Sequence, residues 1–338
     1  MSFLTSIRTR AAIAAVIGLV FALPTAPANA AGQLKPEDRA AFLAELQTRH
    51  TVLPEAAAPL LDQARYQQSI IDAITRPAEA KPWKAYRPIF LTADRIAKGQ
   101  AFLAEHRAAL EDIQARTGVA APIIVAILGV ETGYGANTGR YRVLDALYTL
   151  GFFYPKRAEF FRGELAQAFA LAGEEQLDLT TITGSYAGAM GWGQFIPSSY
   201  RAYAVDGDGD GRRDLWNSLP DVLASVANYF SAHKWLAGEP VAVRAVRADG
   251  ARDFTPDSLE AKFTLPELAA LGYRPTEAIG HAAPATLVTL EGADGPEYWI
   301  TFQNFYVISR YNRSPLYSMA VFQLAQAIAG TDSPALTP

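Results

Sequence analysis

The chain of 338 residues contains no cysteine. This absence excludes disulfide bonds, thiolate metal sites and cysteine nucleophiles. An excess of positive charge is missing too, because 30 basic and 34 acidic side chains give a formal net charge of -4 at pH 7. Nucleic acid is therefore not expected as a partner. Since 50% of the residues are hydrophobic and only 19% are charged, the sequence predicts a folded protein of about two domains.

The chain also lacks an apolar run of the roughly 20 residues that span a bilayer. A shorter apolar run at 11–23 follows Arg8 and Arg10 and precedes the small-residue sequence Ala28-Asn29-Ala30. This order is typical of a signal peptide with its cleavage site, so residues 1–30 are predicted to be removed on export. The alternative is a buried or amphipathic N-terminal helix.

The remaining sequence is mainly helical, with one interruption. Helix-like apolar spacing is found at 35–80, 93–114, 143–150, 158–171, 221–235 and 318–328. Between the last two segments, residues 241–246, 285–290 and 298–302 have the composition of strands, and Thr264 and Glu267 have capping-box spacing. The sequence therefore predicts a helical body interrupted by a small α+β insertion.

The first candidate for chemistry is Glu131. It follows a continuous apolar run at 123–130, which predicts a helix buried on all sides, and Gly133 and Gly135 end that helix. A carboxyl group on such a segment is poorly solvated, so its pKa should be raised, as a general acid requires. The alternative is a structural glutamate paired with Arg140 or Arg142.

The second candidate is a loop of alternating aspartate and glycine: Asp206, Asp208, Asp210 and Gly211. Aspartates at positions 1, 3 and 5 with glycine at 6 match the first half of an EF-hand calcium loop. Asn217 stands at position 12 in place of glutamate, so a longer loop could close at Asp221. The alternative is an acidic surface turn.

Two further segments combine polar and aromatic residues. The segment 184–195 is rich in glycine and aromatic residues and contains Ser185 and Gln194, which suit a sugar ligand. Its alternative role is close helix packing through glycine. The segment 304–317 contains Tyr311, Asn312 and Tyr317.

Several of these motifs, taken in order, resemble the lytic murein transglycosylase B family. The resemblance rests on 130–135 (Val-Glu-Thr-Gly-Tyr-Gly), 142–147, 184–200, the Asp206 loop and 310–314 (Arg-Tyr-Asn-Arg-Ser). It covers about residues 83–328 and is weakest in the insertion. It implies a mainly α fold with a lysozyme-like helical core. The expected organisation is: signal peptide 1–30, N-terminal helical region 31–90, catalytic core with calcium loop 91–235, α+β insertion 236–302, return to the core 303–330, and flexible tail 331–338.

The resemblance also implies an activity and the residues that carry it. The expected reaction is cleavage of the MurNAc–GlcNAc β-1,4 bond of peptidoglycan glycan strands, leaving a 1,6-anhydro sugar, with Glu131 as the single acid/base. The implied sugar-binding residues are Ser185, Gln194, Tyr229, Tyr311, Asn312 and Tyr317. The implied calcium ligands are Asp206, Asp208, Asp210, Asp221 and the backbone carbonyl of Arg212.

The resemblance implies a place in the cell as well. Membrane-bound members of the family carry a lipidated cysteine, which this chain lacks, so a soluble periplasmic form without a lipid anchor is expected. No organic cofactor is expected. Two other functions stay open: a lysozyme-like hydrolase with Asp145 as a second carboxylate, and a non-catalytic scaffold that binds peptidoglycan.

Overall fold

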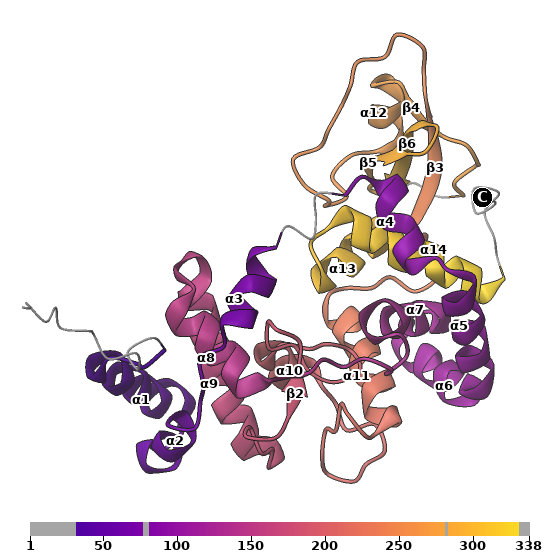
Figure 1. The fold of residues 1–338 in the computed structure, drawn as a ribbon. Helices are drawn as coiled ribbons and strands as arrows, with labels where there is room; N and C mark the ends of the chain where they lie inside the picture. The colour runs from indigo at the N-terminus through magenta and orange to yellow at the C-terminus, as the bar shows by residue number, and fades with distance from the viewer. Residues whose placement is uncertain (1–31, 77–80, 281–282, 331–338) are drawn as a thin grey trace, which may run out of the picture.

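The computed structural model describes residues 32–76, 81–280 and 283–330. The predicted signal peptide at 1–30 and the predicted tail at 331–338 lie outside the described residues. Within these ranges helices predominate, and the longer strands belong to one four-stranded sheet at the top of Figure 1. The predicted mainly α fold with a small α+β insertion is confirmed.

Three N-terminal helices cover one side of the helical body. They are α1 (Pro36–His50), α2 (Pro54–Leu61) and α3 (Gln68–Thr75). Phe42 of α1 is buried and meets Phe152 and Phe169 edge-on, at ring-centroid distances of 5.7 and 5.8 Å. These contacts seat α1 on the helix pair α8 (Val143–Phe153) and α9 (Ala158–Glu175), as Figure 1 shows.

The fourth helix, α4 (Trp83–Phe90), packs elsewhere. It lies against α14 (Pro315–Ala329) and β5 (Thr286–Gly292), beside the insertion (Figure 1). Its Trp83 side chain is buried, and the ammonium of Lys84 pairs with Glu291 at 2.7 Å. The segment 31–90 thus supplies helices to two parts of the molecule. Its boundaries as a region stay a prediction.

The centre of the helical body is α7 (Ala121–Thr132). Its side chains at 123–128 are at most 4% exposed, because the segment has no polar face. The helices packed around it are α5 (Ala93–Glu105), α6 (Arg107–Thr117), α11 (Leu219–Ala232) and α14. The expected helix at 93–114 is interrupted at His106, where the backbone leaves the helical region. Apolar spacing continues across that break, so periodicity did not reveal it.

The turn after α7 is joined to the glycine-rich segment by a short strand pair. Strand β1 (Tyr141–Arg142) is antiparallel to β2 (Thr183–Gly184). Gly139 has φ +101° and approaches Gly184 so closely that a Cβ atom on it would lie 2.0 Å from the Gly184 carbonyl carbon. This contact requires glycine. The elements that complete the helical body are η1 (Pro155–Arg157), α10 (Pro197–Tyr203) and α13 (Gln303–Tyr311).

The insertion has its own sheet and core. Its antiparallel strands run in the order β4-β3-β6-β5, with β3 (Ala242–Arg247), β4 (Tyr273–Pro275) and β6 (Gly295–Thr301). The three expected strands are confirmed, whereas β4 was not expected because its three residues carry no alternation. Helix α12 (Leu265–Ala270) begins with the predicted capping box of Thr264 and Glu267. Buried residues that include Leu268, Tyr273 and Ile300 form the separate core.

No single helix in the described part of the chain is long and apolar enough to cross a membrane. Helices α6 and α7 would meet the length and composition requirement only as a pair, and they are bent by 112°. The α7 half of that pair is the buried central helix.

Candidate active site

Glu131 lies in the last turn of α7. The helix ends where Gly133 adopts a left-handed backbone (φ 60°, ψ 47°). The Gly133 N–H donates to the Gly129 carbonyl at 3.2 Å, and the Tyr134 N–H donates to the Leu128 carbonyl at 3.0 Å. Glu131 itself is partly exposed. A carboxyl group anchored in a largely buried helix therefore reaches solvent at that helix's end.

The environment of Glu131 favours its protonated form. Burial raises the pKa of this carboxyl from 4.5 to about 7. The hydroxyl of Tyr317, a buried residue of α14, donates to Glu131 Oε1 at 2.6 Å, and this hydrogen bond lowers the pKa against the larger effect of burial. The pKa expected from the apolar sequence before Glu131 is thus confirmed. A carboxyl with this pKa can donate and accept a proton near neutral pH.

Two more of the predicted tyrosines hold the glycine-rich segment in place. The Tyr311 hydroxyl donates to the Gly193 carbonyl at 2.6 Å, and the Tyr229 hydroxyl donates to the Arg310 carbonyl at 2.6 Å. Their ring centroids are 4.7 Å apart, with Phe195 5.7 Å from one ring and 5.8 Å from the other. The segment 184–195 therefore packs against α11 and α13. Burial raises the pKa of the Tyr311 hydroxyl, and the nearby Glu131 carboxyl raises it further.

Two of the residues predicted to bind sugar, Ser185 and Gln194, form hydrogen bonds with backbone groups of the protein. Ser185 Oγ accepts N–H groups of Ala187 and Ala189 at 3.2 and 3.0 Å. Gln194 has a left-handed backbone (φ 53°), and its Nε2 donates to the Thr138 carbonyl at 3.0 Å. Asn312 is exposed. Ser185 and Gln194 shape the segment whether or not they touch a sugar, so their predicted role as ligand contacts stays a prediction.

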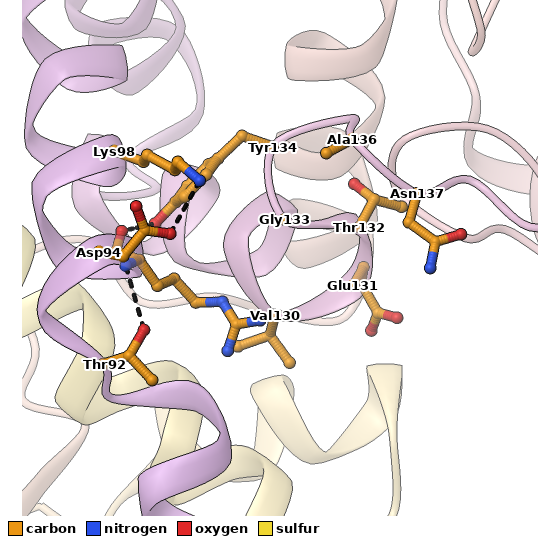
Figure 2. Close-up of a pocket in the computed structure, with 11 residues that line it drawn as sticks. Thr92, Asp94, Lys98, Val130, Glu131, Thr132, Gly133, Tyr134, Ala136 and Asn137 are labelled. Atoms are coloured by element: carbon orange, nitrogen blue, oxygen red, sulfur yellow. Dashed lines mark hydrogen bonds and ion pairs between the residues drawn. The ribbon is translucent and has the colours of Figure 1, made fainter.

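The cleft beside Glu131 has a second wall that the sequence analysis missed. Figure 2 shows Thr92, Asp94 and Lys98 of the α5 side facing the residues that end α7. The cleft has a volume of about 300 Å³ and also contains Arg95. Asp94 is exposed and pairs with Lys98 at 2.8 Å, while the Glu131 carboxyl points away from them. No local pattern marks these residues, because they reach the site only through the packing of α5 on α7.

The structure also places the residues named in the alternatives. Arg142 pairs with Asp145 at 2.5 Å, so Asp145 rather than Glu131 is its partner. Asp145 is buried, and its Oδ1 also accepts the Arg65 N–H at 2.8 Å, which ties the N-terminal helices to α8. Arg140 lies over the Tyr141 ring at 5.6 Å. Asp145 is thus committed to a structural contact.

The acidic loop brings three of its predicted ligands together. One carboxylate oxygen from each of Asp206, Asp208 and Asp210 lies within 4.8 Å of the others. The loop is wound tightly, since the Gly209 and Gly211 N–H groups donate to the Asp206 carboxylate at 2.6 and 2.8 Å. Converging carboxylate oxygens are the ligands that Ca²⁺ prefers.

The other two predicted ligands lie differently. Asp221 is buried at the start of α11, and its two oxygens accept the N–H groups of Gly207 and Asp214, each at 2.7 Å. It thereby closes the loop through the backbone, outside the group of three aspartates. The Arg212 guanidinium donates to the Glu175 carbonyl at 3.2 Å. The ligand roles of Asp221 and of the Arg212 carbonyl stay predictions.

Comparison with known proteins places the chain in a family. The family described as "Transglycosylase SLT domain" matches residues 35–326. The chain is 41% identical over 298 residues to the membrane-bound lytic murein transglycosylase B of Escherichia coli (strain K12), covering 85% of this chain and 81% of that relative. Among solved structures, the catenated lytic transglycosylase SltB1 from Pseudomonas aeruginosa has 47% identity and a TM-score of 0.83 over 88% of this chain and 98% of its own.

A second solved structure bears on the acidic loop. The Escherichia coli lytic transglycosylase Slt35 in complex with calcium has 40% identity and a TM-score of 0.79, over 86% of this chain and 92% of its own. The expected lysozyme-like helical core is confirmed by these structural matches. The chain belongs to the transglycosylase SLT domain family.

Proposed function

We propose that this protein is a lytic transglycosylase that cleaves the β-1,4 bond between MurNAc and GlcNAc in peptidoglycan glycan strands. The observation that carries the proposal is the Glu131 carboxyl, which belongs to a partly exposed residue beside a cleft, has a pKa of about 7 and accepts a hydrogen bond from Tyr317. The substrate class is supported by the name of the Escherichia coli relative, a lytic murein transglycosylase, and the reaction class by that of SltB1, a lytic transglycosylase.

In the first step, protonated Glu131 donates its proton to the glycosidic oxygen. The bond between that oxygen and C1 of MurNAc breaks, and positive charge develops on the sugar ring. Desolvation keeps the acid protonated near neutral pH, and the Tyr317 hydroxyl then stabilises the carboxylate that remains.

In the second step, the Glu131 carboxylate acts as a base. It takes the proton from the C6 hydroxyl of the same MurNAc while that oxygen bonds to C1, forming the 1,6-anhydro ring. The attack is intramolecular and gains from proximity, so it needs no positioned water. The carboxyl ends the cycle protonated, as it began.

The surroundings of Glu131 support a mechanism with one carboxylate. Most glycosidases use two, flanking the scissile bond. Asp145 is engaged by Arg142 and by the Arg65 backbone, and Asp94 is an exposed residue paired with Lys98. Neither is arranged as a partner for Glu131.

Mass spectrometry of products from purified peptidoglycan tests the proposal. The wild-type protein should release fragments with 1,6-anhydro ends, each lighter by one water than the product of a hydrolase. Reducing ends would instead establish the lysozyme-like alternative. Glu131→Gln should still bind peptidoglycan but release no fragments, whereas Glu277→Gln, an exposed glutamate in the insertion, should match the wild type. Unchanged release by Glu131→Gln would refute the role of Glu131.

We also propose that the acidic loop holds calcium in a structural role. The three aspartates supply converging hard oxygens, and the related Slt35 was solved in complex with calcium. Calcium at about a hundredfold excess over its dissociation constant should stabilise the fold by about 3 kcal/mol. Thermal unfolding with and without a chelator measures this. Asp206→Ala should abolish the difference and Asp257→Ala, in the insertion, should keep it. A melting temperature unaffected by calcium would refute the calcium site and favour the alternative of an acidic surface turn.

For the location, we propose export to the periplasm by a signal peptide at residues 1–30. Peptidoglycan lies outside the cytoplasmic membrane, and the order of Arg8, Arg10, the apolar run and Ala30 supports the assignment. N-terminal sequencing of the protein from a periplasmic fraction should begin near Ala31. An intact N-terminus in the cytoplasmic fraction would contradict it.

A further inference from the structure

The turn that follows Glu131 has an unusual backbone. Gly133, Tyr134 and Gly135 have φ values of 60°, 62° and 83°, so three consecutive residues are left-handed. Tyrosine adopts that conformation only when its surroundings hold it there. The conformation of the turn at 133–135 is therefore maintained by contacts with the rest of the protein, because the intrinsic backbone preference of Tyr134 does not favour it.

One side of the turn is held by the Thr132 hydroxyl. The side chain is buried, at 3% exposure. Its hydroxyl donates to the Trp192 carbonyl at 3.0 Å and accepts the Gly135 N–H at 3.0 Å. The same hydroxyl lies 3.3 Å from the Leu128 carbonyl. Thr132 thus bonds the end of α7 both to its own turn and to the glycine-rich segment.

Trp192, whose carbonyl accepts the Thr132 hydroxyl, is itself bonded to residues 215–216 at the end of the acidic loop. Its backbone N–H donates to the Leu215 carbonyl, and its indole Nε1 donates to the Trp216 carbonyl, both at 3.0 Å. Gly135 packs on the indole ring so closely that a Cβ atom would lie 2.4 Å from it. Two hydrogen bonds and one ring contact therefore fix Trp192 between residues 215–216 and the turn.

The opposite side of the turn is held by Tyr134. Its hydroxyl donates to the Arg95 carbonyl of α5 at 2.8 Å. Cβ atoms added at Gly99 and Gly129 would lie 2.4 and 2.7 Å from that hydroxyl oxygen, so both glycines are needed for the ring to fit. The turn is thus held by Tyr134 on the α5 side and by Thr132 and Trp192 on the other side.

We infer that Thr132 is a positioning residue for Glu131, and that Trp192 links the position of residues 215–216 to that of Thr132. The inference rests on the proposed catalytic role of Glu131. Proton transfer depends on heavy-atom geometry, and a displacement of about 1 Å can cost about a hundredfold in rate. Without the hydroxyl, the Trp192 carbonyl and the Gly135 N–H lose their partner, and the last turn of α7 is free to shift.

Steady-state kinetics on soluble glycan strands test the inference with an isosteric variant and a rescue. Thr132→Val should lower kcat by about 10- to 100-fold and leave KM within about twofold, because substrate contacts are unchanged. Thr132→Ser keeps the hydroxyl and should retain most of kcat. The control is Thr286→Val, which removes a buried hydroxyl in the insertion and should leave kcat unchanged. Wild-type kcat in Thr132→Val, or an equal loss in Thr132→Ser, would overturn the positioning role.

A second variant tests the link to residues 215–216, and also serves if Thr132→Val folds poorly. Trp192→Phe keeps a ring against Gly135 but removes the bond to the Trp216 carbonyl. It should lower kcat by about 3- to 10-fold with KM unchanged, and should add little to the effect of Thr132→Val, since both act on one connection. Wild-type kcat in Trp192→Phe, or fully additive losses, would refute this link.

Glu131→Gln, assayed in parallel, separates the two proposals. If Glu131→Gln is inactive while Thr132→Val is fully active, only the positioning role fails. If Glu131→Gln is active, the proposed catalytic role fails first.

Discussion

Replacing Glu131 by glutamine should make the protein more stable at alkaline pH. Burial raises the pKa of this carboxyl in the folded state to about 7, above its ordinary value of 4.5. Below pH 4.5 the group is protonated in both the folded and unfolded states. As pH rises from 4.5 to 7 the unfolded state releases the proton first, so the folded wild type loses stability over that range. Glutamine does not titrate and avoids this loss.

The size of the effect follows from the difference between the two pKa values. A tenfold change in proton affinity is worth about 1.4 kcal/mol, so a pKa of about 7 in place of 4.5 costs the wild type about 3 kcal/mol above pH 7. This is an upper limit, because Glu131 is partly exposed and solvent screens its charge. The glutamine carbonyl can still accept the Tyr317 hydroxyl, so the hydrogen bond at 2.6 Å should survive.

Denaturant unfolding of both proteins from pH 4 to pH 8.5 provides the assay. The free energy of unfolding of Glu131→Gln minus that of the wild type should be near zero at pH 4, rise between pH 4.5 and 7, and then level off. Titration of all other groups is common to both proteins and cancels in the difference. Glu277→Gln, on an exposed residue of the insertion, should give a flat difference. A flat difference for Glu131→Gln as well would refute the desolvated carboxyl on which the proposed mechanism depends.

Three further substitutions follow from the same contacts. Tyr317→Phe removes the hydrogen bond that lowers the pKa of Glu131, so the alkaline limb of the pH profile of kcat/KM should move to higher pH; a limb that stays or moves down would contradict this. Gly139→Ala should destabilise the fold by about 3 kcal/mol or more in thermal melts, because its φ is +101° and its Cβ would strike Gly184; a near-native melting temperature would contradict that contact. Asp145→Asn keeps a hydrogen-bonding side chain but removes its charge, so it should cost about 1–3 kcal/mol of stability and leave cleavage by the folded protein intact; loss of cleavage with the fold preserved would favour a two-carboxylate hydrolase.

The sequence alone was enough to identify the central element of the site. The apolar run at 123–130 has no polar face, so its burial could be predicted without knowing what covers it. The raised pKa of Glu131 followed from that burial, and the left-handed end of the helix followed from Gly133. The grouping of Asp206, Asp208 and Asp210 was equally local, since alternating glycines let a short loop turn its carboxylates together.

Other parts of the site could not be read from any local pattern. The Tyr317 hydroxyl reaches Glu131 from a helix 186 residues further along the chain. Asp94, Arg95 and Lys98 line the cleft only because α5 packs on α7, and their spacing is that of an ordinary exposed helix face. Asp221 closes the acidic loop through backbone N–H groups, a role that a count of loop positions does not indicate.

The difference between the features that local sequence predicts and those that it does not has a physical basis. Helix formation, burial of an apolar segment and the turn of a glycine-rich loop depend on residues a few positions apart. Local sequence is therefore enough to predict the helical body, the buried helix and the position of Glu131 at the end of that helix. Hydrogen-bond partners and the second wall of a cleft depend on which distant surfaces meet when the core packs. The hydrogen bond between Tyr317 and Glu131, and the contacts through which Trp192 joins the end of the acidic loop to Thr132, therefore arise from the packing of distant segments and have no local signal.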